Sequence, residues 1–257
     1  MDELIFGLHA VKSALNYCSS DASDQQEKEQ KSVSIVFVDR SRKDNRVNAI
    51  IDLAKKKSIQ VSLLQRKKLD EMVQGNHQGV VARSNVPEVK SEQFLDELLE
   101  SLEQEPFLLI LDGVQDPHNL GACLRTADAA GVHAIIVPKD RSVSLTPTVR
   151  KVACGADQNV PLIQVTNLAR TMKLLKNYQI WIIGTADETD ATLYQSKLKG
   201  ALALVMGTEG KGMRRLTREN CDSLVKIPML GSVESLNVSV ATGICLFEAV
   251  RQRKGTC

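Results

Sequence analysis

LALVMGTEGKGM (residues 202–213) and IPMLGSVESLNVSVATGICLFEAVRQR (227–253) are the two stretches that decide the fold of this chain. In the first, an apolar run ends in a glycine-rich turn with one acid, Glu209. In the second, a short apolar run ends in a polar turn that opens a long predicted helix. Such turns at the ends of buried strands form the ligand crevice of an open α/β sheet. The pattern therefore predicts an α/β fold with a binding site near the C-terminus.

The region 106–257 alternates apolar runs with amphipathic segments. Strands are predicted at 106–112, 132–138, 160–165, 179–184, 202–207 and 224–228, and helices at 119–130, 146–153, 167–177, 213–220 and 236–253. The first run, PFLLILD, is apolar almost throughout, which is typical of a strand covered on both faces. This alternation predicts a mostly parallel, doubly wound sheet.

Residues 1–84 show the same alternation and are predicted to form a small N-terminal α/β domain. Helices are predicted at 7–17, 44–57 and 66–73, and strands at 33–39, 59–64 and 79–84. The stretch 19–32 has almost no large apolar residue and is expected to be a loop. Residues 85–105 are expected to be an acidic linker, with an amphipathic helix over 91–104.

Composition is that of an ordinary globular protein, with 43% hydrophobic and 25% charged residues. No apolar run reaches membrane-spanning length, and the N-terminus does not resemble a signal peptide. We therefore expect a cytoplasmic protein with no membrane partner. The six cysteines form no Cys-x-x-Cys pair, so neither zinc nor a disulfide framework is expected.

The formal net charge of +2 hides an uneven distribution. Residues 84–105 hold seven acids and one lysine, whereas residues 40–68 hold ten basic and two acidic side chains. The basic run could attract a phosphate backbone. A solvated helix face is the alternative explanation for such a run.

Glu209 and two residues of the second stretch are candidate site residues. An ordinary turn would also explain Glu209, and a P-loop is disfavoured because Lys211 is followed by glycine rather than Ser or Thr. Ser235 and Asn237 flank Leu236 where the last helix is predicted to begin. They could cap that helix, or they could face a ligand beside its free N–H groups.

Asn119 and Arg125 are candidates on the helix predicted at 119–130. Asn119 follows Asp-Pro-His, where a helix cap is common. Arg125 could form a surface pair with Asp128 at i,i+3. Each candidate alone has a structural explanation, but their order along the chain is more specific.

Three motifs in this order resemble those of the SpoU/TrmH family of RNA ribose 2'-O-methyltransferases. They are N-x-G-x-x-x-R (119–125), M-G-x-E-G-x-G (206–212) and I-P-M-x-G-S-V-x-S-L-N-V-S-V-A (227–241). Three flanks extend the resemblance over essentially the whole chain: FGLHAVKSAL (6–15), NHQGVVA (76–82) and DRSVSLTPTVRKVACGA (140–156). The flanks are similar to those of members that modify a guanosine in the peptidyl-transferase region of bacterial 23S rRNA.

The resemblance implies a C-terminal domain with a trefoil-knotted cofactor site. S-adenosylmethionine would lie in the knot crevice, and no metal is implied. The implied cofactor contacts are Thr185, Ala186, Gly207, Ile227, Met229 and Leu236. The N-terminal domain would be an L30-like RNA-binding module, and the protein would act as a homodimer on 23S rRNA or a precursor of the large subunit.

The resemblance also implies a catalytic set, made of Asn119, Arg125, Glu209, Ser235 and Asn237. The family proposal makes Arg125 the proton acceptor. Because a guanidinium keeps its proton in proteins, we expect Arg125 to position the 2'-OH or a phosphate instead. Two alternatives stay open, a tRNA ribose methyltransferase and a non-catalytic RNA-binding or ribosome assembly factor. A dinucleotide-binding oxidoreductase has only the α/β pattern in its favour.

Overall fold

The chain forms two compact units, Met1–Pro87 (unit 1) and Glu88–Cys257 (unit 2). The structure is a computed structural model that describes residues 2–17, 33–42, 44–85 and 89–255. The polar stretch 19–32, which we expect to be a loop, lies outside the described residues. Each unit has a hydrophobic core of its own.

Unit 1 contains a four-stranded sheet of order β1-β4-β2-β3. Its strands are β1 (Asp2–Phe6), β2 (Val33–Asp39), β3 (Gln60–Leu64) and β4 (Val80–Asn85). Its helices are α1 (Leu8–Tyr17), α2 (Asn45–Lys56) and α3 (Arg66–Met72). Strands β2 and β3 are parallel, whereas β4 is antiparallel to both β1 and β2.

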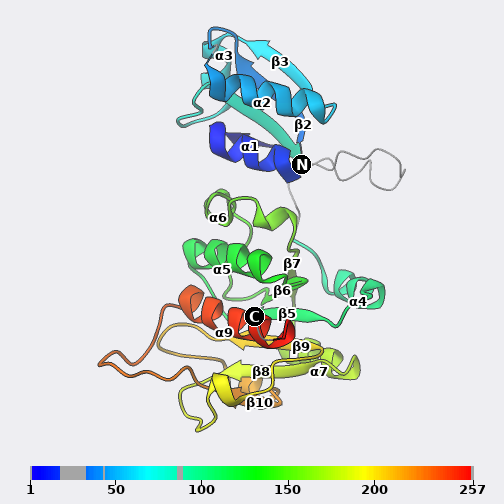
Figure 1. Ribbon diagram of the computed structural model, residues 1–257, viewed down its shortest axis with the longest axis vertical. Helices are drawn as coiled ribbons and strands as arrows, with labels where there is room; N and C mark the ends of the chain where they lie inside the picture. Colours follow the sequence, from blue (N-terminus) through cyan, green and yellow to red (C-terminus); the bar gives the residue numbers. More distant parts are fainter. Residues whose placement is uncertain (1, 18–32, 43, 86–88, 256–257) are drawn as a thin grey trace. The chain divides into compact units, whose positions relative to one another are not determined.

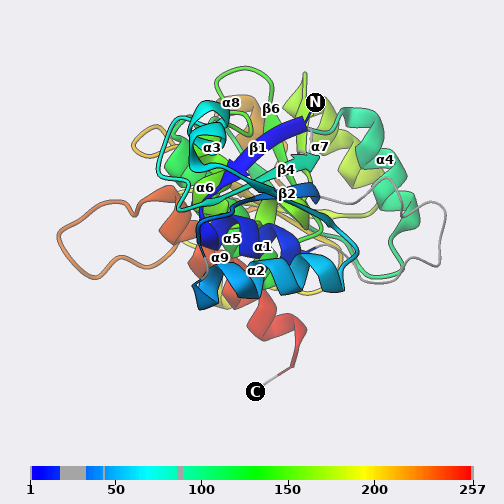
Figure 2. The ribbon, with the colours of Figure 1, turned by 90° about the horizontal axis from the view of Figure 1, so that it is seen from above.

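The two longer helices of unit 1 cover one face of this sheet, and α3 covers the other. Helices α1 and α2 lie side by side (Figures 1 and 2) and bury Leu15 and Ile50 against β2 and β4. On the opposite face, Leu69 of α3 packs near Val81 of β4. The predicted elements of this unit are therefore confirmed, and β1 is an additional strand that the sequence pattern did not indicate.

Unit 2 contains a six-stranded parallel sheet of order β10-β8-β9-β5-β6-β7. The strands are β5 (Phe107–Leu111), β6 (Ala134–Pro138), β7 (Leu162–Val165), β8 (Trp181–Thr185), β9 (Leu202–Met206) and β10 (Ser223–Val225). Every residue of β5 and β9 is buried, as expected for strands with helices on both faces. The predicted parallel, doubly wound sheet is confirmed.

Helices lie on both faces of the larger sheet. They are α4 (Glu92–Ser101), α5 (Pro117–Ala130), α6 (Pro147–Ala153), α7 (Leu168–Asn177), α8 (Arg215–Glu219) and α9 (Val238–Arg253). Helices α5, α6 and α9 share one core with the sheet, and α4 and α7 share the other. Helix α4 falls within the segment expected as a linker, and it buries Leu95 and Leu99 in the core of unit 2.

A glycine allows α5 and α6 to pack closely. A Cβ atom at Gly121 would lie 2.6 Å from Val152 Cβ and 2.7 Å from the Val149 carbonyl oxygen. At the other end of α5, Gly131 ends the helix with φ +73°. The trefoil knot implied by the resemblance stays a prediction. No helix in the described part of the chain has the length and apolar character needed to cross a bilayer.

Candidate active site

A pocket of about 260 Å³ lies at the carboxyl ends of β8, β9 and β10. The last residue of each strand lines it, namely Thr185, Met206 and Val225. Parallel sheets bind ligands at this edge, because their loops converge there. All six predicted cofactor contacts line this pocket: Thr185, Ala186, Gly207, Ile227, Met229 and Leu236.

The glycine-rich loop after β9 forms one wall of the pocket. A Cβ atom at Gly207 would lie 2.2 Å from the Gly212 carbonyl carbon and 2.4 Å from the Met213 nitrogen, so only glycine fits. Thr208 and Gly212 exchange two backbone hydrogen bonds of 3.0 and 2.9 Å. The loop is therefore pinched at its base, and Glu209 lies at its tip.

Asn237 joins three segments that are distant in sequence. Its Oδ1 accepts a hydrogen bond from Ser239 N–H, so it caps α9. Its Nδ2 donates to Glu209 Oε1 at 2.6 Å and to Asn119 Oδ1 at 2.9 Å. Glu209 Oε1 also accepts from the Val238 N–H at 3.1 Å, which places a carboxylate at the positive end of α9. Asn237 therefore caps α9 and also binds Glu209, which lines the pocket, although Asn237 itself is not among the lining residues.

The structure corrects the capping interpretation of Asn119. Asp116 caps α5 by accepting from the His118 N–H at 2.9 Å, and Pro117 occupies the first turn. Asn119 is the third residue of α5, and its Oδ1 accepts a hydrogen bond from Asn237 Nδ2. An aspartate before proline was the residue to consider as the cap.

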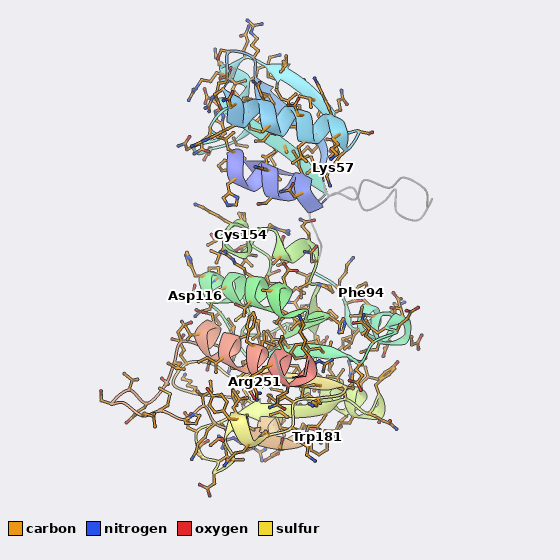
Figure 3. All side chains as sticks on the ribbon, viewed as in Figure 1. Lys57, Phe94, Asp116, Cys154, Trp181 and Arg251 are labelled. Carbon is orange, nitrogen blue, oxygen red and sulfur yellow. The ribbon has the colours of Figure 1, made fainter. Side chains whose placement is uncertain are left out.

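Arg125 does not pair with Asp128, because each has another partner. Arg125 Nη1 lies 3.8 Å from the Cys154 sulfur at the end of α6. The Asp128 carboxylate accepts a hydrogen bond from Asn159 Nδ2 at 3.0 Å. Figure 3 shows Cys154 beside α6 and Asp116 beside the start of α5. Arg125 is exposed and is not among the residues that line the pocket.

Ser235 lies in the exposed segment that leads into α9. This segment, orange in Figures 1 and 2, extends away from the sheet before α9 begins. Leu230 within it is 99% exposed. Ser235 and Leu236 return to the pocket and line it together with Glu209. Four of the five predicted catalytic residues therefore lie at the pocket or in its hydrogen-bond network, and Arg125 lies apart.

Asp112 is a functional support that the sequence analysis missed. This carboxylate follows β5 directly and is 1% exposed. Its oxygens accept hydrogen bonds from the Arg214 backbone N–H at 2.8 Å and from Arg214 Nε at 2.6 Å, and Arg214 Nη2 lies at 2.6 Å. The pair fixes the end of the glycine-rich loop to the central strand. An acid immediately after an entirely apolar strand was the available signal.

Charged side chains that the sequence analysis did not name also line the pocket: Asp187, Glu188, Lys211, Arg218, Lys226 and Glu234. Glu188 accepts a hydrogen bond from Arg218 of α8. Its own backbone N–H and this guanidinium hold the pKa of Glu188 below its ordinary value. Among the described residues, no group of three or more His, Cys, Asp or Glu side chains could hold a metal ion.

Two family patterns together match most of the chain. The SpoU rRNA Methylase family matches residues 106–247, and the RNA 2'-O ribose methyltransferase substrate-binding family matches residues 4–89. The first match includes most of unit 2, with the pocket. The second falls in unit 1 and extends two residues beyond it.

Curated relatives are similar over almost the full length. The 23S rRNA (guanosine-2'-O-)-methyltransferase RlmB of Escherichia coli K12 is 58% identical over 98% of this chain and 100% of its own length. RlmB of Photorhabdus laumondii is 55% identical over 98% of this chain and 99% of its own length. Among solved structures, the SpoU methyltransferase AviRb of Streptomyces viridochromogenes in complex with AdoMet has a TM-score of 0.75 at 22% identity, covering 100% of this chain and 92% of that one. This last likeness shows a shared fold.

Replacing Arg214 with alanine should lower the stability of the protein by roughly 2–4 kcal/mol. The substitution leaves the buried Asp112 carboxylate without its guanidinium partner, which is costly. Arg215→Ala is the matched control, because its pair with Glu219 is exposed and should contribute less than about 0.5 kcal/mol. Urea unfolding measures both. Equal losses in the two variants would contradict the role given to the buried pair.

Proposed function

The chain belongs to the SpoU rRNA methylase family, and we propose that it methylates the ribose 2'-OH of a guanosine in bacterial 23S rRNA. The observation that carries the proposal is 58% identity to a 23S rRNA guanosine 2'-O-methyltransferase over 98% of the chain. The substrate-binding match in unit 1 favours rRNA over the tRNA alternative, since it accompanies full-length similarity to rRNA enzymes. The target guanosine would lie in the peptidyl-transferase region.

The pocket residues fit S-adenosylmethionine as the methyl donor. Ile227, Met229 and Leu236 give the pocket an apolar wall that suits the adenine ring. The carboxylates of Glu188 and Glu209 suit hydroxyl groups and positive charge. When bound, S-adenosylmethionine supplies an activated methyl group on a sulfonium centre.

The reaction needs a ribose hydroxyl held in line with that methyl group. Alignment of two bound reactants supplies much of the rate. Asn119, Glu209 and Asn237 form a connected polar set, which Ser235 extends along the pocket. We assign to this set the shaping of the ribose and methyl site. Glu209 could accept the hydroxyl proton late in the reaction, and water is the other acceptor.

The proposal includes a homodimer in the bacterial cytoplasm. Val240 and Phe247 of α9 are 52% and 49% exposed, and their i,i+7 spacing places them on one helix face. Packing of this apolar face against a second copy would remove it from water. Light scattering of the full chain should give twice the monomer mass of 28.2 kDa. A monomeric mass at micromolar concentration would contradict the dimer.

Transfer of labelled methyl to rRNA tests the function directly. The full chain and labelled S-adenosylmethionine are incubated with 23S rRNA that lacks the modification, and the labelled nucleotide is mapped. Label on a guanosine 2'-O of the peptidyl-transferase region is the expected result. Label on tRNA alone would favour the alternative substrate. Cofactor binding with no transfer to rRNA or a precursor particle would favour the assembly-factor alternative.

Glu209→Gln separates proton acceptance from loop anchoring. Glutamine keeps an oxygen that can accept from Asn237 Nδ2 and from the Val238 N–H, but it lacks the charge. If Glu209 accepts the proton, turnover should fall by about 10²-fold or more. Affinity for S-adenosylmethionine should change little in this variant, and Glu209→Ala should also lose turnover more than affinity. A defect confined to cofactor affinity would argue against the assignment.

Arg125→Lys tests whether the guanidinium positions the substrate. Lysine keeps the positive charge but loses the planar pair of donors that can hold a phosphate or hydroxyl. We expect turnover to fall at least about tenfold, with little change in cofactor affinity. Single-turnover methyl transfer measures the effect, and calorimetry with S-adenosylmethionine serves as the control. Turnover close to that of the unmodified protein would refute the positioning role.

A further inference from the structure

The described basic residues between positions 40 and 68 separate into two groups in space, and Lys43 lies outside the described residues. Strands β2 and β3 run parallel, so the segments that follow them leave from the same edge of the sheet. The Arg40 N–H donates to the Leu64 carbonyl at 2.9 Å and joins these two segments. We call this end of the sheet the basic edge; its described cations are Arg40, Arg42, Arg46, Arg66, Lys67 and Lys68.

Helix α2 carries the remaining lysines to the opposite edge. It has 12 residues and is about 18 Å long, and it returns the chain to the start of β3. Lys55 and Lys56 occupy its last turn. Figure 3 shows Lys57 at the end of α2 that lies away from α3.

Helix electrostatics explain the lysines at one edge and not the cations at the other. Lys55 and Lys56 complement the negative end of α2, a position that stabilises a helix. Arg46 lies in the first turn of α2, and Lys67 and Lys68 lie in the first turn of α3, and neither turn holds an acid. Cations are unfavourable at the positive end of a helix. Asp44 caps α2 and offsets Arg46, but the N-cap of α3 is the uncharged Gln65, so no acid at the start of α3 offsets Lys67 and Lys68.

Two acids at the basic edge, Asp39 and Asp44, are already engaged within the protein. Asp39 is 1% exposed and accepts from the Ser41 N–H and hydroxyl at 3.0 and 2.7 Å. The Ser41 N–H, followed by other groups that include Arg66 and Arg42, lowers the pKa of Asp39. Asp44 caps α2 and pairs with Arg42 at 2.6 Å. Arg40, Lys67 and Lys68 are exposed above these engaged carboxylates.

Residues of the motif NHQGVVA form hydrogen bonds with residues of the basic edge and of α3. His77 is 2% exposed, donates from Nε2 to Asp70 Oδ1 at 2.8 Å, and accepts from the Gly79 N–H at 3.0 Å. Arg42 donates to the Gln78 carbonyl. A Cβ atom at Gly79 would lie 2.5 Å from Arg42 Cδ, so the glycine permits this contact. The buried imidazole thus ties the loop to α3.

We propose that the basic edge, and not the lysine-rich end of α2, is the surface on which unit 1 binds the phosphate backbone of rRNA. The proposal rests on the proposed function, which supplies the RNA. Exposed arginines suit phosphate oxygens because the planar guanidinium can bind two oxygens at once, and the exposed lysines add further positive charge.

Two matched double substitutions test the proposal in the full-length protein. Lys67→Gln with Lys68→Gln removes two exposed charges from the basic edge, and Lys55→Gln with Lys56→Gln removes two from the opposite edge. Binding to an rRNA fragment of the peptidyl-transferase region is measured against salt concentration. The 67/68 variant should weaken binding at least about tenfold and reduce the slope of log affinity against log salt by about 2. The 55/56 variant should change affinity less than about threefold and leave the slope unchanged.

Thermal melting provides a second measurement, in which the variant that loses RNA affinity is expected to be the more stable of the two. The 67/68 variant should melt at or above the temperature of the unmodified protein, whereas the 55/56 variant should melt slightly lower. Equal losses of RNA affinity, or a loss in the 55/56 variant alone, would overturn the proposal. Methyl transfer by the unmodified protein would then still support the proposed function. An unmodified protein that binds S-adenosylmethionine but no rRNA would overturn both.

Discussion

The buried carboxylate of Asp112 is the constraint on which the rest of the site depends. It lies where the central strand β5 ends, and it holds both the backbone and the side chain of Arg214. The glycine-rich loop starts at Gly207 and is pressed against its own end by a contact that leaves no room for a side chain. Because both ends of the loop are fixed, Glu209 reaches the start of α9. Without the Asp112 contact, the end of the loop at Arg214 would lose its anchor to β5, while its start would stay joined to β9.

The polar residues at the pocket serve the folding of the site, and the proposed chemistry uses the same residues. Asn237 caps α9 with one side-chain atom and binds Glu209 and Asn119 with the other. The carboxylate of Glu209 is also stabilised by the helix end that it faces. Asn237 therefore both caps α9 and joins the polar network beside the pocket. Asn119 joins that network without capping α5, because Asp116 caps that helix.

The strands could be predicted because burial on both faces requires continuous apolar runs, as in FLLIL and LALVM. Strand β1 (DELIF) could not be predicted, because two acids open it and its partner β4 lies about 80 residues away in the sequence.

All six cofactor contacts predicted from the motifs line one pocket, and their roles stay proposals. The partners of Arg125 depend on how α6 packs against α5, which no local pattern encodes. In the sequence, residues 40–68 form one basic segment. In the structure, α2 divides the described cations of this segment between two edges of a sheet, which no local pattern encodes either.

The position of the pocket in the chain has a consequence for synthesis. Every residue that lines it lies between Thr185 and Ala241, and α9 closes it. Domains fold as they leave the ribosome, so unit 1, with its own core, can form well before the pocket exists. A translation product that stopped before α9 would still display the basic edge but would have no complete cofactor site.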